Sequence, residues 1–383
     1  YNFESSGGLL STVEKCNGSG DCRKLSFAGG TMCPSYRATM DEKDSTRGRA
    51  NVLREFLTQN TKENPFDHPE IKDAMDLCVS CKACKSECPS NVDMASLKAE
   101  FLFQYQKSNP VSLRTKLIAH NAKLNSIARH FSGVYNFIAN TSWFKTLIGV
   151  HPNRSLPSLN STTLRQWFAS YQQKEHPKKV YLFCDEYTNH YDVEIGKKSI
   201  ILLNSLGYHV LMTAHSESAR AYISKGFLEQ AKAIATANIK TFNALINTTT
   251  PLLGIEPSAI LGFRDEYPNL VDSVLKPKAE NLAKNVFTIE EFLAYEMKAN
   301  TIDVSKFTTA SKTIYYHGHC HQKALSSNSY ALTTLGIPAN FTVQPIDAGC
   351  CGMAGAFGYE KEHYELSQQI GEDRLFPTLR TID

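Results

Sequence analysis

Four cysteines in one short run are the residues whose type and spacing point most directly to chemistry. They read Cys78-x2-Cys81-x2-Cys84-x3-Cys88, with Pro89 next. Three thiolates two residues apart can wrap one face of a four-iron, four-sulfur cube, and a fourth cysteine before proline often ligates the other cube of a two-cluster protein. A zinc knuckle or half of a disulfide framework fits less well. Zinc sites usually pair two C-x2-C units across a longer gap, and small disulfide scaffolds are shorter and richer in cysteine. The run therefore predicts a cubane iron–sulfur cluster.

A second, looser motif lies upstream and reads Cys16-x5-Cys22-x10-Cys33, followed by Pro34. Seven cysteines fill one cube and leave three thiols for another centre. If ligation crosses between motifs, Cys33 joins Cys78, Cys81 and Cys84, and the second centre is left with Cys16, Cys22 and Cys88. If ligation is local, Cys88 completes the first cube and the three upstream thiols share the remainder. Plain buried cysteines are the alternative for the upstream motif. We expect one complete 4Fe-4S cluster and leave the second open.

A third group of cysteines lies near the end of the chain, in His317-Gly318-His319-Cys320-His321 and in Cys350-Cys351-Gly352. Adjacent cysteines rarely form a disulfide with each other, because the bond needs a longer Cα separation than one peptide supplies. We therefore expect Cys320, Cys350 and Cys351 to hold a third metal or cluster, either iron–sulfur or zinc. At most one of the three histidines is expected to face it. Cys184 is expected to be an ordinary core thiol.

The remaining sequence carries no other chemical motif, so no catalytic residue and no residue for an organic cofactor is predicted. The glycines of Gly349–Gly355 match neither a phosphate-binding loop nor a dinucleotide fingerprint. No flavin-binding segment is found. Cations expected near the clusters are Arg23, Lys24, Lys82 and Lys85. Arg47 and Arg49 are expected either there or at a solvated helix start.

The elements that position these residues differ along the chain. Residues 1–110 predict a mainly α, ferredoxin-like iron–sulfur domain with two cysteine motifs, including a helix that begins near Asp44 to Thr46. Residues 111–177 predict a helical linker. Short β-type runs that alternate with helices then predict an α/β region: Val180–Phe183, Val210–Met212, Leu252–Ile255, Thr313–Tyr316 and Phe341–Val343. A strand–helix–strand unit recurs there, which predicts two similar lobes, 178–300 and 301–383. Serine and glutamate stand in the first lobe where the second has its cysteine pair, so we expect the first to hold no metal.

Composition excludes several functional classes. The chain has 383 residues, with 41 basic and 38 acidic side chains and a net charge of +3, so no electrostatic argument favours nucleic acid. No apolar stretch approaches the roughly 18 residues of a spanning helix. Eleven cysteines in metal-type spacings favour a reducing cytoplasm over secretion. We expect a cytoplasmic protein, at most peripheral at the inner face of the membrane.

These motifs together carry a family resemblance that covers nearly the whole chain. The cysteine run, the α/β region ending in Cys350-Cys351-Gly352, and the segments Cys16–Lys24, Met32–Tyr36, Ser45–Ala50 and His317–Lys323 resemble iron–sulfur oxidoreductases with cysteine-rich CCG domains. That group includes iron–sulfur subunits of glycolate oxidase and anaerobic glycerol-3-phosphate dehydrogenase, and heterodisulfide reductase subunits. The stronger resemblance is to the carboxyl-terminal part of fused FAD-linked oxidases of the D-lactate or D-2-hydroxyglutarate dehydrogenase type. One departure is Glu256-Pro257-Ser258-Ala259, where related proteins carry a cysteine after the proline–serine pair.

The resemblance implies an oxidoreductase in which this chain is the electron-transfer part of a flavin-dependent 2-hydroxy acid dehydrogenase. FAD would lie in an upstream domain or subunit and not in this chain, and a quinone or another carrier would accept the electrons. Two alternatives stay open. The Cys320, Cys350 and Cys351 centre could itself reduce a disulfide, or the chain could be a zinc-stabilised scaffold without redox activity.

Overall fold

The computed structural model describes residues 1–3 and 7–382. They form many helices and two parallel sheets. The cysteine-rich amino-terminal part is helical. Its helices are α1 (Leu9–Val13), α2 (Pro34–Thr39), α3 (Thr46–Thr58), α4 (Pro69–Asp76), α5 (Ala83–Glu87) and α6 (Met94–Tyr105). The helix expected near Asp44 to Thr46 is α3, whose N-cap Ser45 accepts a hydrogen bond from the backbone N–H of Gly48.

A second group of helices follows and leads into the sheets. These are α7 (Leu113–Ala119), α8 (Asn121–Ala128), α9 (Ser132–Ala139), α10 (Ser142–Leu147) and α11 (Leu164–Ser170). The short 3₁₀ turn η5 (Arg129–Phe131) joins α8 to α9 without a break. Helices therefore occupy most of residues 111–177, the range that was expected to be a helical linker.

The larger sheet has four parallel strands in the order β2-β1-β3-β4. The strands are β1 (Lys178–Phe183), β2 (Tyr208–Leu211), β3 (Leu252–Gly254) and β4 (Val286–Thr288). Helices cover both faces: α12 (Glu186–His190), α13 (Val193–Ser205), α14 (Arg220–Ser224), α15 (Leu228–Phe242), α16 (Pro257–Ile260), α17 (Tyr267–Leu270), α18 (Lys276–Ala283) and α19 (Ile289–Lys298). Adjacent residues of one strand enter different apolar clusters: Leu252 lies in one with Phe183, and Leu253 in another with Leu182. Both faces are thus buried, as parallel sheets require.

The smaller sheet pairs β5 (Lys312–Tyr316) with β6 (Phe341–Pro345), also in parallel. The connection carries α20 (Cys320–Leu325) and α21 (Asn328–Leu335), and the chain ends in α22 (Tyr364–Leu379). These two strands are half exposed, unlike the buried strands of the larger sheet. The two α/β halves therefore share a strand–helix–strand order and differ in sheet size and burial.

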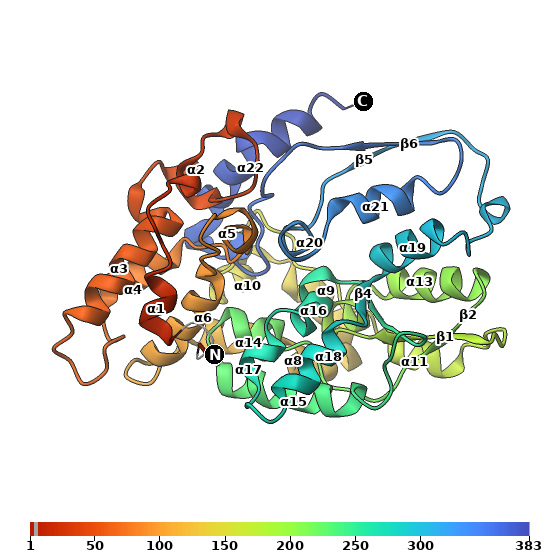
Figure 1. Cartoon of the computed structure of the whole chain (residues 1–383), viewed down its shortest axis with the longest axis horizontal. Helices are drawn as coiled ribbons and strands as arrows, with labels where there is room; N and C mark the ends of the chain where they lie inside the picture. Colours follow the sequence, from red (N-terminus) through yellow and green to blue (C-terminus); the bar gives the residue numbers. More distant parts are fainter. Residues whose placement is uncertain (4–6, 383) are drawn as a thin grey trace.

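The carboxyl-terminal helix returns to the amino-terminal part of the fold. Figure 1 shows α22 beside α2, next to the red and orange helices, while β5 and β6 extend away from them. Arg37 of α2 is buried and its Nη1 lies 3.4 Å from the Asp373 carboxylate of α22. The α20 helix packs on α5, so the third cysteine group meets the first across this contact.

Candidate metal centres

Four cysteines from both amino-terminal motifs line one cavity. Cys78 follows α4, Cys81 lies in the next loop, and Cys84 lies in α5. Cys33, from the upstream motif, is the N-cap of α2 and completes the set. The four thiols therefore surround one shared, largely apolar hollow, and four thiolates are the donor set that a cubane cluster takes. Of the two ligand arrangements left open by the sequence, the structure brings together the crossed one.

The loop between Cys78 and Cys84 turns tightly around this cavity. Ser80 and Lys82 both have positive φ, 50° and 61°, a backbone conformation that side chains other than glycine adopt at a cost. The two left-handed residues flank Cys81, which lines the cavity with Cys78 and Cys84. The rest of the lining is largely apolar and includes Met32, Pro34, Val79, Met94 and Ala95.

The electrostatics of these thiols suit a positively charged occupant. Burial raises the pKa of Cys81, and the charges of Cys320, Cys84 and Cys33 raise it further. Burial likewise raises the pKa of Cys84, with added repulsion from Asp93 and Cys78. Grouped, buried thiolates are unfavourable without a compensating cation, and iron supplies that charge. The donor set therefore fits a thiolate-bound iron–sulfur cluster.

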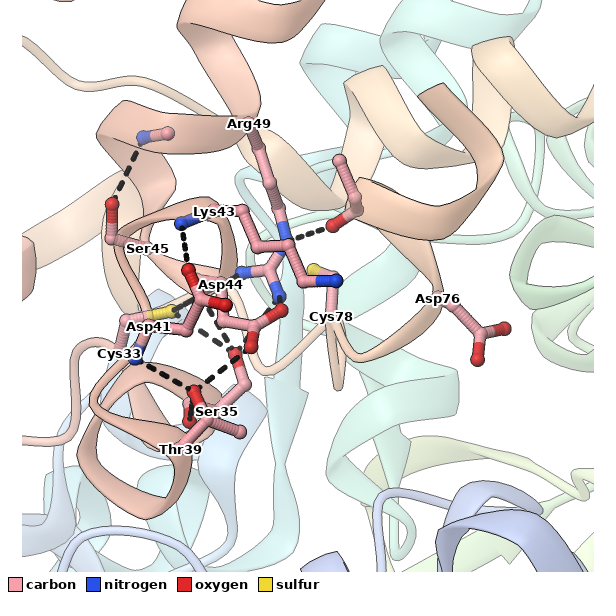
Figure 2. A network of polar contacts seen from close by, with 12 residues as sticks. Cys33, Ser35, Thr39, Asp41, Lys43, Asp44, Ser45, Arg49, Asp76 and Cys78 are labelled. Atoms are coloured by element: carbon pink, nitrogen blue, oxygen red, sulfur yellow. Dashed lines mark hydrogen bonds and ion pairs between the residues drawn. The ribbon is translucent and has the colours of Figure 1, made fainter. Parts of the chain in front are cut away.

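Arg49 is a cation that lines this cavity from the protein interior, and Figure 2 shows its contacts. Its side chain is fully buried. Nη1 donates to the Cys33 Sγ at 3.5 Å, Nη2 to the Ser35 Oγ at 3.0 Å, and Nε to the Ala74 carbonyl at 2.7 Å. Burial alone would lower the pKa of Arg49, but the charges of Cys78, Cys33 and Asp44 raise it. The alternative of a solvated helix start is therefore wrong for this residue.

The other expected cations are paired with carboxylates. Lys82 is buried, with Nζ 3.3 Å from Asp93 Oδ2 and 3.2 Å from Glu266 Oε1, and it also pairs with Asp265. Lys85 pairs with Asp265 as well. Near the upstream motif, Arg23 pairs with Glu42 and Lys24 with Asp21. Among these cations, Arg49 is the one whose side chain donates to a thiol.

The remaining amino-terminal cysteines lie in the same apolar cluster. Cys22 lies in the 3₁₀ turn η2 (Asp21–Arg23), and its Sγ accepts from the Arg47 backbone N–H at 3.4 Å. Burial raises the pKa of Cys22, and so do the charges of Cys33 and Cys16. Cys88 ends α5, and Cys16 follows α1. All seven thiols thus belong to one cluster of packed residues.

Glu87 connects the two motifs and was not expected from the sequence. The one sequence signal for this role is its position directly before Cys88. Its carboxylate accepts from the Thr31 backbone N–H at 2.8 Å and from the Met32 backbone N–H at 3.1 Å. These bonds hold the loop before Cys33 against the end of α5. The crossed arrangement of thiols depends on this attachment.

The third group lies beside the first. Cys320 begins α20, and its Sγ is 3.9 Å from the Cys350 Sγ in the loop after β6. Hydrogen bonding from Cys350 and from His317 lowers the pKa of Cys351 to about 3, despite its burial. His317 therefore lies near Cys351, and its Nδ1 is buried without a hydrogen-bond partner in the part of the chain that the structure describes. In the part of the chain that the structure describes, no three His, Cys, Asp or Glu side chains converge closely enough to hold a single metal ion.

His321 bridges the first and third groups. It is buried, and its Nε2 is 3.1 Å from the Ser80 carbonyl oxygen, beside Cys81. Val79, Cys81, Cys320 and Cys350 share one apolar cluster. Burial lowers the pKa of His321 well below its usual range, so the imidazole is neutral and donates to that carbonyl.

The first α/β half carries other residues at the positions that correspond to the third cysteine group. Glu256 caps α16, and its Oε1 lies 3.6 Å from His319 Nε2. Ala259, which stands where related proteins carry the cysteine, is buried in the apolar cluster of the larger sheet. Cys184 is buried in the sheet core, where its thiol donates to Asn189 Oδ1 at 3.5 Å. Burial raises the pKa of Cys184 to about 12. This agrees with an ordinary core thiol.

Comparison with known proteins defines the class to which these sites point. Residues 12–92 match the family model described as "4Fe-4S dicluster domain". The match covers both amino-terminal motifs, so the chain carries an iron–sulfur electron-transfer domain. No solved structure matches the chain.

The curated relatives are dehydrogenases. The chain is 26% identical to D-2-hydroxyglutarate dehydrogenase of Pantoea ananatis (strain AJ13355) over 96% of its own length and 40% of that protein. It is also 26% identical to D-2-hydroxyglutarate dehydrogenase of Escherichia coli (strain K12), over 94% of the chain and 39% of the relative. One subunit of the anaerobic glycerol-3-phosphate dehydrogenase of Escherichia coli (strain K12) is 25% identical, over 77% of the chain and 74% of that relative.

These matches confirm the resemblance to the iron–sulfur parts of FAD-linked dehydrogenases, and the chain is related to oxidoreductases. It spans about two fifths of the length of the D-2-hydroxyglutarate dehydrogenases. No helix among the residues described is both long and apolar enough to cross a membrane.

Proposed function

We propose that this chain is the iron–sulfur electron-transfer part of a flavin-dependent 2-hydroxy acid dehydrogenase. The supporting observation is the cavity lined by Cys33, Cys78, Cys81 and Cys84, with the third cysteine group packed against it. When bound, iron–sulfur clusters take up and release single electrons. Electrons would come from FAD in an upstream domain or partner subunit and leave to a quinone or another carrier. No nucleic acid is involved in this proposal.

We assign the ligands in the crossed arrangement. Cys33, Cys78, Cys81 and Cys84 hold one 4Fe-4S cluster, and Cys16, Cys22 and Cys88 hold the second with a ligand that is not cysteine or with an open iron. Cys320, Cys350 and Cys351 hold the third metal or cluster, and no catalytic residue is assigned. The corresponding division of the chain is 1–110, a linker 111–177, a metal-free CCG lobe 178–300 and a metal-binding CCG lobe 301–383.

The chain's own residues adjust and shield this site. Arg49 donates to Cys33, which stabilises the thiolate and favours the reduced form of the centre. The apolar lining excludes water from the thiols. His321 of α20, bonded to the Ser80 carbonyl, holds α20 against the loop that carries Cys81. In each case, the residue binds or orients a group of the site.

Substitution of single cysteines tests the ligand assignment. On anaerobically purified protein, Cys33→Ser and Cys81→Ser should remove the same spectroscopic signal of a reduced cubane and each lower iron and sulfide by about one cluster. Cys184→Ser, in the sheet core, should leave both unchanged. If Cys88→Ser removed the signal that Cys81→Ser removes and Cys33→Ser did not, ligation would be local and the crossed assignment would be wrong.

Metal analysis separates the other functions. Iron and acid-labile sulfide in near-equal amounts, with colour that bleaches on reduction, support electron transfer. Zinc without sulfide would establish a scaffold instead. A disulfide reductase at the third centre is supported by the 3.9 Å separation of the Cys320 and Cys350 Sγ atoms. That function requires a thiol substrate to be turned over with a strong artificial donor, and loss of that turnover in Cys351→Ser.

We further propose that the protein is cytoplasmic and works at the inner face of a membrane, where quinones reside. Binding of the reduced protein to a quinone analogue, followed by reoxidation of the clusters, is the measurement for the acceptor. Reoxidation only by other acceptors would exclude the quinone.

A further inference from the structure

The helical segment α8–η5–α9 has its apolar side on the outside. Five large apolar residues recur at helical spacing and are exposed: Leu124 (40%), Ile127 (66%), Phe131 (69%), Val134 (60%) and Phe137 (78%). We call these five the outward stripe. A surface helix normally buries such a face, so the stripe is an unpartnered apolar surface.

The inner side of the same segment is polar. Asn125 is buried and donates to the Tyr191 hydroxyl at 2.8 Å, and Asn136 donates to the Leu159 carbonyl at 3.0 Å. Arg129 donates to Gln166 Oε1 at 3.0 Å. The usual amphipathic order is therefore inverted, and polar bonds attach the segment to the body while its apolar residues face away.

The neighbouring helices extend this surface. Leu113 of α7 and both Trp143 and Leu147 of α10 are more than 60% exposed. Val150, after α10, forms an antiparallel bridge with Glu360, and Arg114 of α7 pairs with Glu362. The stretches on both sides of the segment are thus tied to the turn after the third cysteine group. Phe357 in that turn belongs to the apolar cluster of Cys350. The exposed surface thus adjoins the third centre.

The distribution of charge indicates which kind of partner covers this surface. Of the 41 Lys and Arg residues of the chain, nine fall between Phe101 and Lys174, where none of the 38 Asp and Glu residues occurs. The rest of the chain therefore holds 32 basic against 38 acidic residues. Lys123 and His130 of the segment and Lys116 of α7 are exposed. This stretch combines Trp, Phe and Leu with Lys and contains no acid, and Glu362, which lies against it, is paired with Arg114. Such a surface is complementary to an anionic lipid headgroup layer.

We propose that the outward stripe, with α7 and α10, is the surface by which this protein lies on an anionic membrane. It is an interfacial contact without a spanning helix. Phenylalanine, leucine and isoleucine side chains enter the boundary between headgroups and acyl chains, and the lysines contact the phosphates. This inference rests on the proposed acceptor function and names the surface that brings the third centre to the membrane.

Vesicle sedimentation tests the proposal with the full chain purified without oxygen. Vesicles of phosphatidylglycerol and phosphatidylethanolamine should carry the protein into the pellet, and phosphatidylcholine vesicles should carry much less. Raising the ionic strength should weaken the binding. The stripe variant Ile127→Ser/Phe131→Ser/Phe137→Ser should bind the anionic vesicles at least about tenfold more weakly.

A matched control is available elsewhere on the surface. Phe27, Ile195 and Val274 are 88%, 52% and 80% exposed. Their combined change to serine removes a similar exposed apolar area and should leave vesicle binding unchanged. All six residues are exposed, so neither variant should unfold, and circular dichroism verifies this.

Three results would overturn the proposal: wild-type protein that stays in the supernatant, a stripe variant that binds as well as wild type, or a control variant that loses binding equally. A wild-type dimer in solution that the stripe substitutions convert to monomer would assign the surface to a protein contact instead.

Iron and sulfide content is measured on the same samples. If the protein has its iron and sulfide but does not bind vesicles, only the proposed membrane surface is wrong. If it binds vesicles but contains no iron, only the proposed electron-transfer function is wrong.

Discussion

Arg49 is the residue on which the candidate cluster site depends most, because it is a fully buried cation beside two thiols. Its partners come from α2, from the turn before α3 and from the end of α4, so one side chain joins three segments. Asp44 is buried as well, with Oδ1 3.5 Å from Arg49 Nη2. Removing the cation would leave a buried carboxylate without compensation.

We expect Arg49→Met to lower the free energy of unfolding by about 3–5 kcal/mol, the usual cost of breaking a buried ion pair. Loss of the hydrogen bond to Cys33 should also lower the midpoint potential of the cubane. Chemical denaturation and redox titration under argon measure the two effects. Arg49→Lys, which keeps the charge and loses the planar geometry, should show an intermediate potential.

Arg54 on the same helix serves as the control, because it is exposed and donates to the exposed Asn51 side chain. Arg54→Met should change stability by no more than about 0.5 kcal/mol. Equal denaturation midpoints for the two methionine variants would contradict the role given to Arg49.

At the scale of elements, the junction between the carboxyl-terminal turn and α4 is an ion-paired contact. His363 is buried, with Nε2 2.9 Å from Asp76 Oδ2 and Nδ1 2.8 Å from Glu360 Oε2. Lys225 also pairs with Glu360. Burial opposes the charged imidazolium, but the hydrogen bonds to the two carboxylates dominate and raise the pKa of His363 to about 9. The turn that follows the third cysteine group is therefore held to α4 by a protonated histidine.

The pH dependence follows from the direction of this shift. A histidine of ordinary pKa, about 6.5, loses its proton in the unfolded chain while His363 keeps it in the folded one. The stabilisation is complete below pH 6.5 and is lost as the pH rises to about 9. We expect a loss of about 1–2 kcal/mol, reduced from the full shift by solvent screening.

Urea denaturation at pH 6 and pH 9.5 measures this loss, and His363→Gln should remove most of the difference between the two conditions. His130, which is exposed, provides the control, and His130→Gln should retain the full difference. An unchanged pH dependence in His363→Gln would show that other groups cause it.

At the scale of the whole molecule, a buried ion network joins the cysteine run to the larger sheet's half. Lys82, between Cys81 and Cys84, pairs with Asp93, Asp265 and Glu266. Arg220 of α14 pairs with the same Glu266 at 2.5 Å. A change in this network therefore acts on two parts of the chain that are distant in sequence.

Glu266→Gln should lower the free energy of unfolding by about 3 kcal/mol, because two buried cations lose a shared carboxylate. Thermal unfolding of the cluster-loaded protein measures the change. Glu229→Gln, on the exposed side of α15, should shift the midpoint little. A Glu266→Gln protein as stable as the Glu229→Gln protein would show that the network contributes nothing net.

The regular parts of this fold could be predicted well from the sequence. Each expected strand coincides with an observed one to within two residues at its start, because short β-branched and aromatic runs between turn residues are a local signal. The strand β4 (Val286–Thr288) was missed, since three residues carry too little pattern. The half-exposed pair β5 and β6 was expected to resemble the larger sheet and is smaller, because its burial depends on contacts that no local pattern encodes.

The candidate site, like the fold, was predictable only in part from the sequence. Spacing alone identified the cysteines that line the cavity. The sequence could not decide whether Cys33 or Cys88 lines a cavity with Cys78, because that depends on how the segment between the motifs folds back. In the structure, hydrogen bonds of Glu87 and Arg49 hold that segment in place. Arg49 could be placed near a cluster only as one of two alternatives, since buried and solvated arginines look alike in sequence.

The order in which the cavity's walls are synthesised has a consequence for loading. Every residue that lines it lies between Met32 and Ala95, while the Cys320 that packs against Cys81 comes some 240 positions later in the chain. Amino-terminal segments fold first as a chain leaves the ribosome. All the lining residues are therefore synthesised before α20, which packs on α5. A cluster inserted before α20 is made meets the cavity without this neighbouring helix, and one inserted afterwards must pass it.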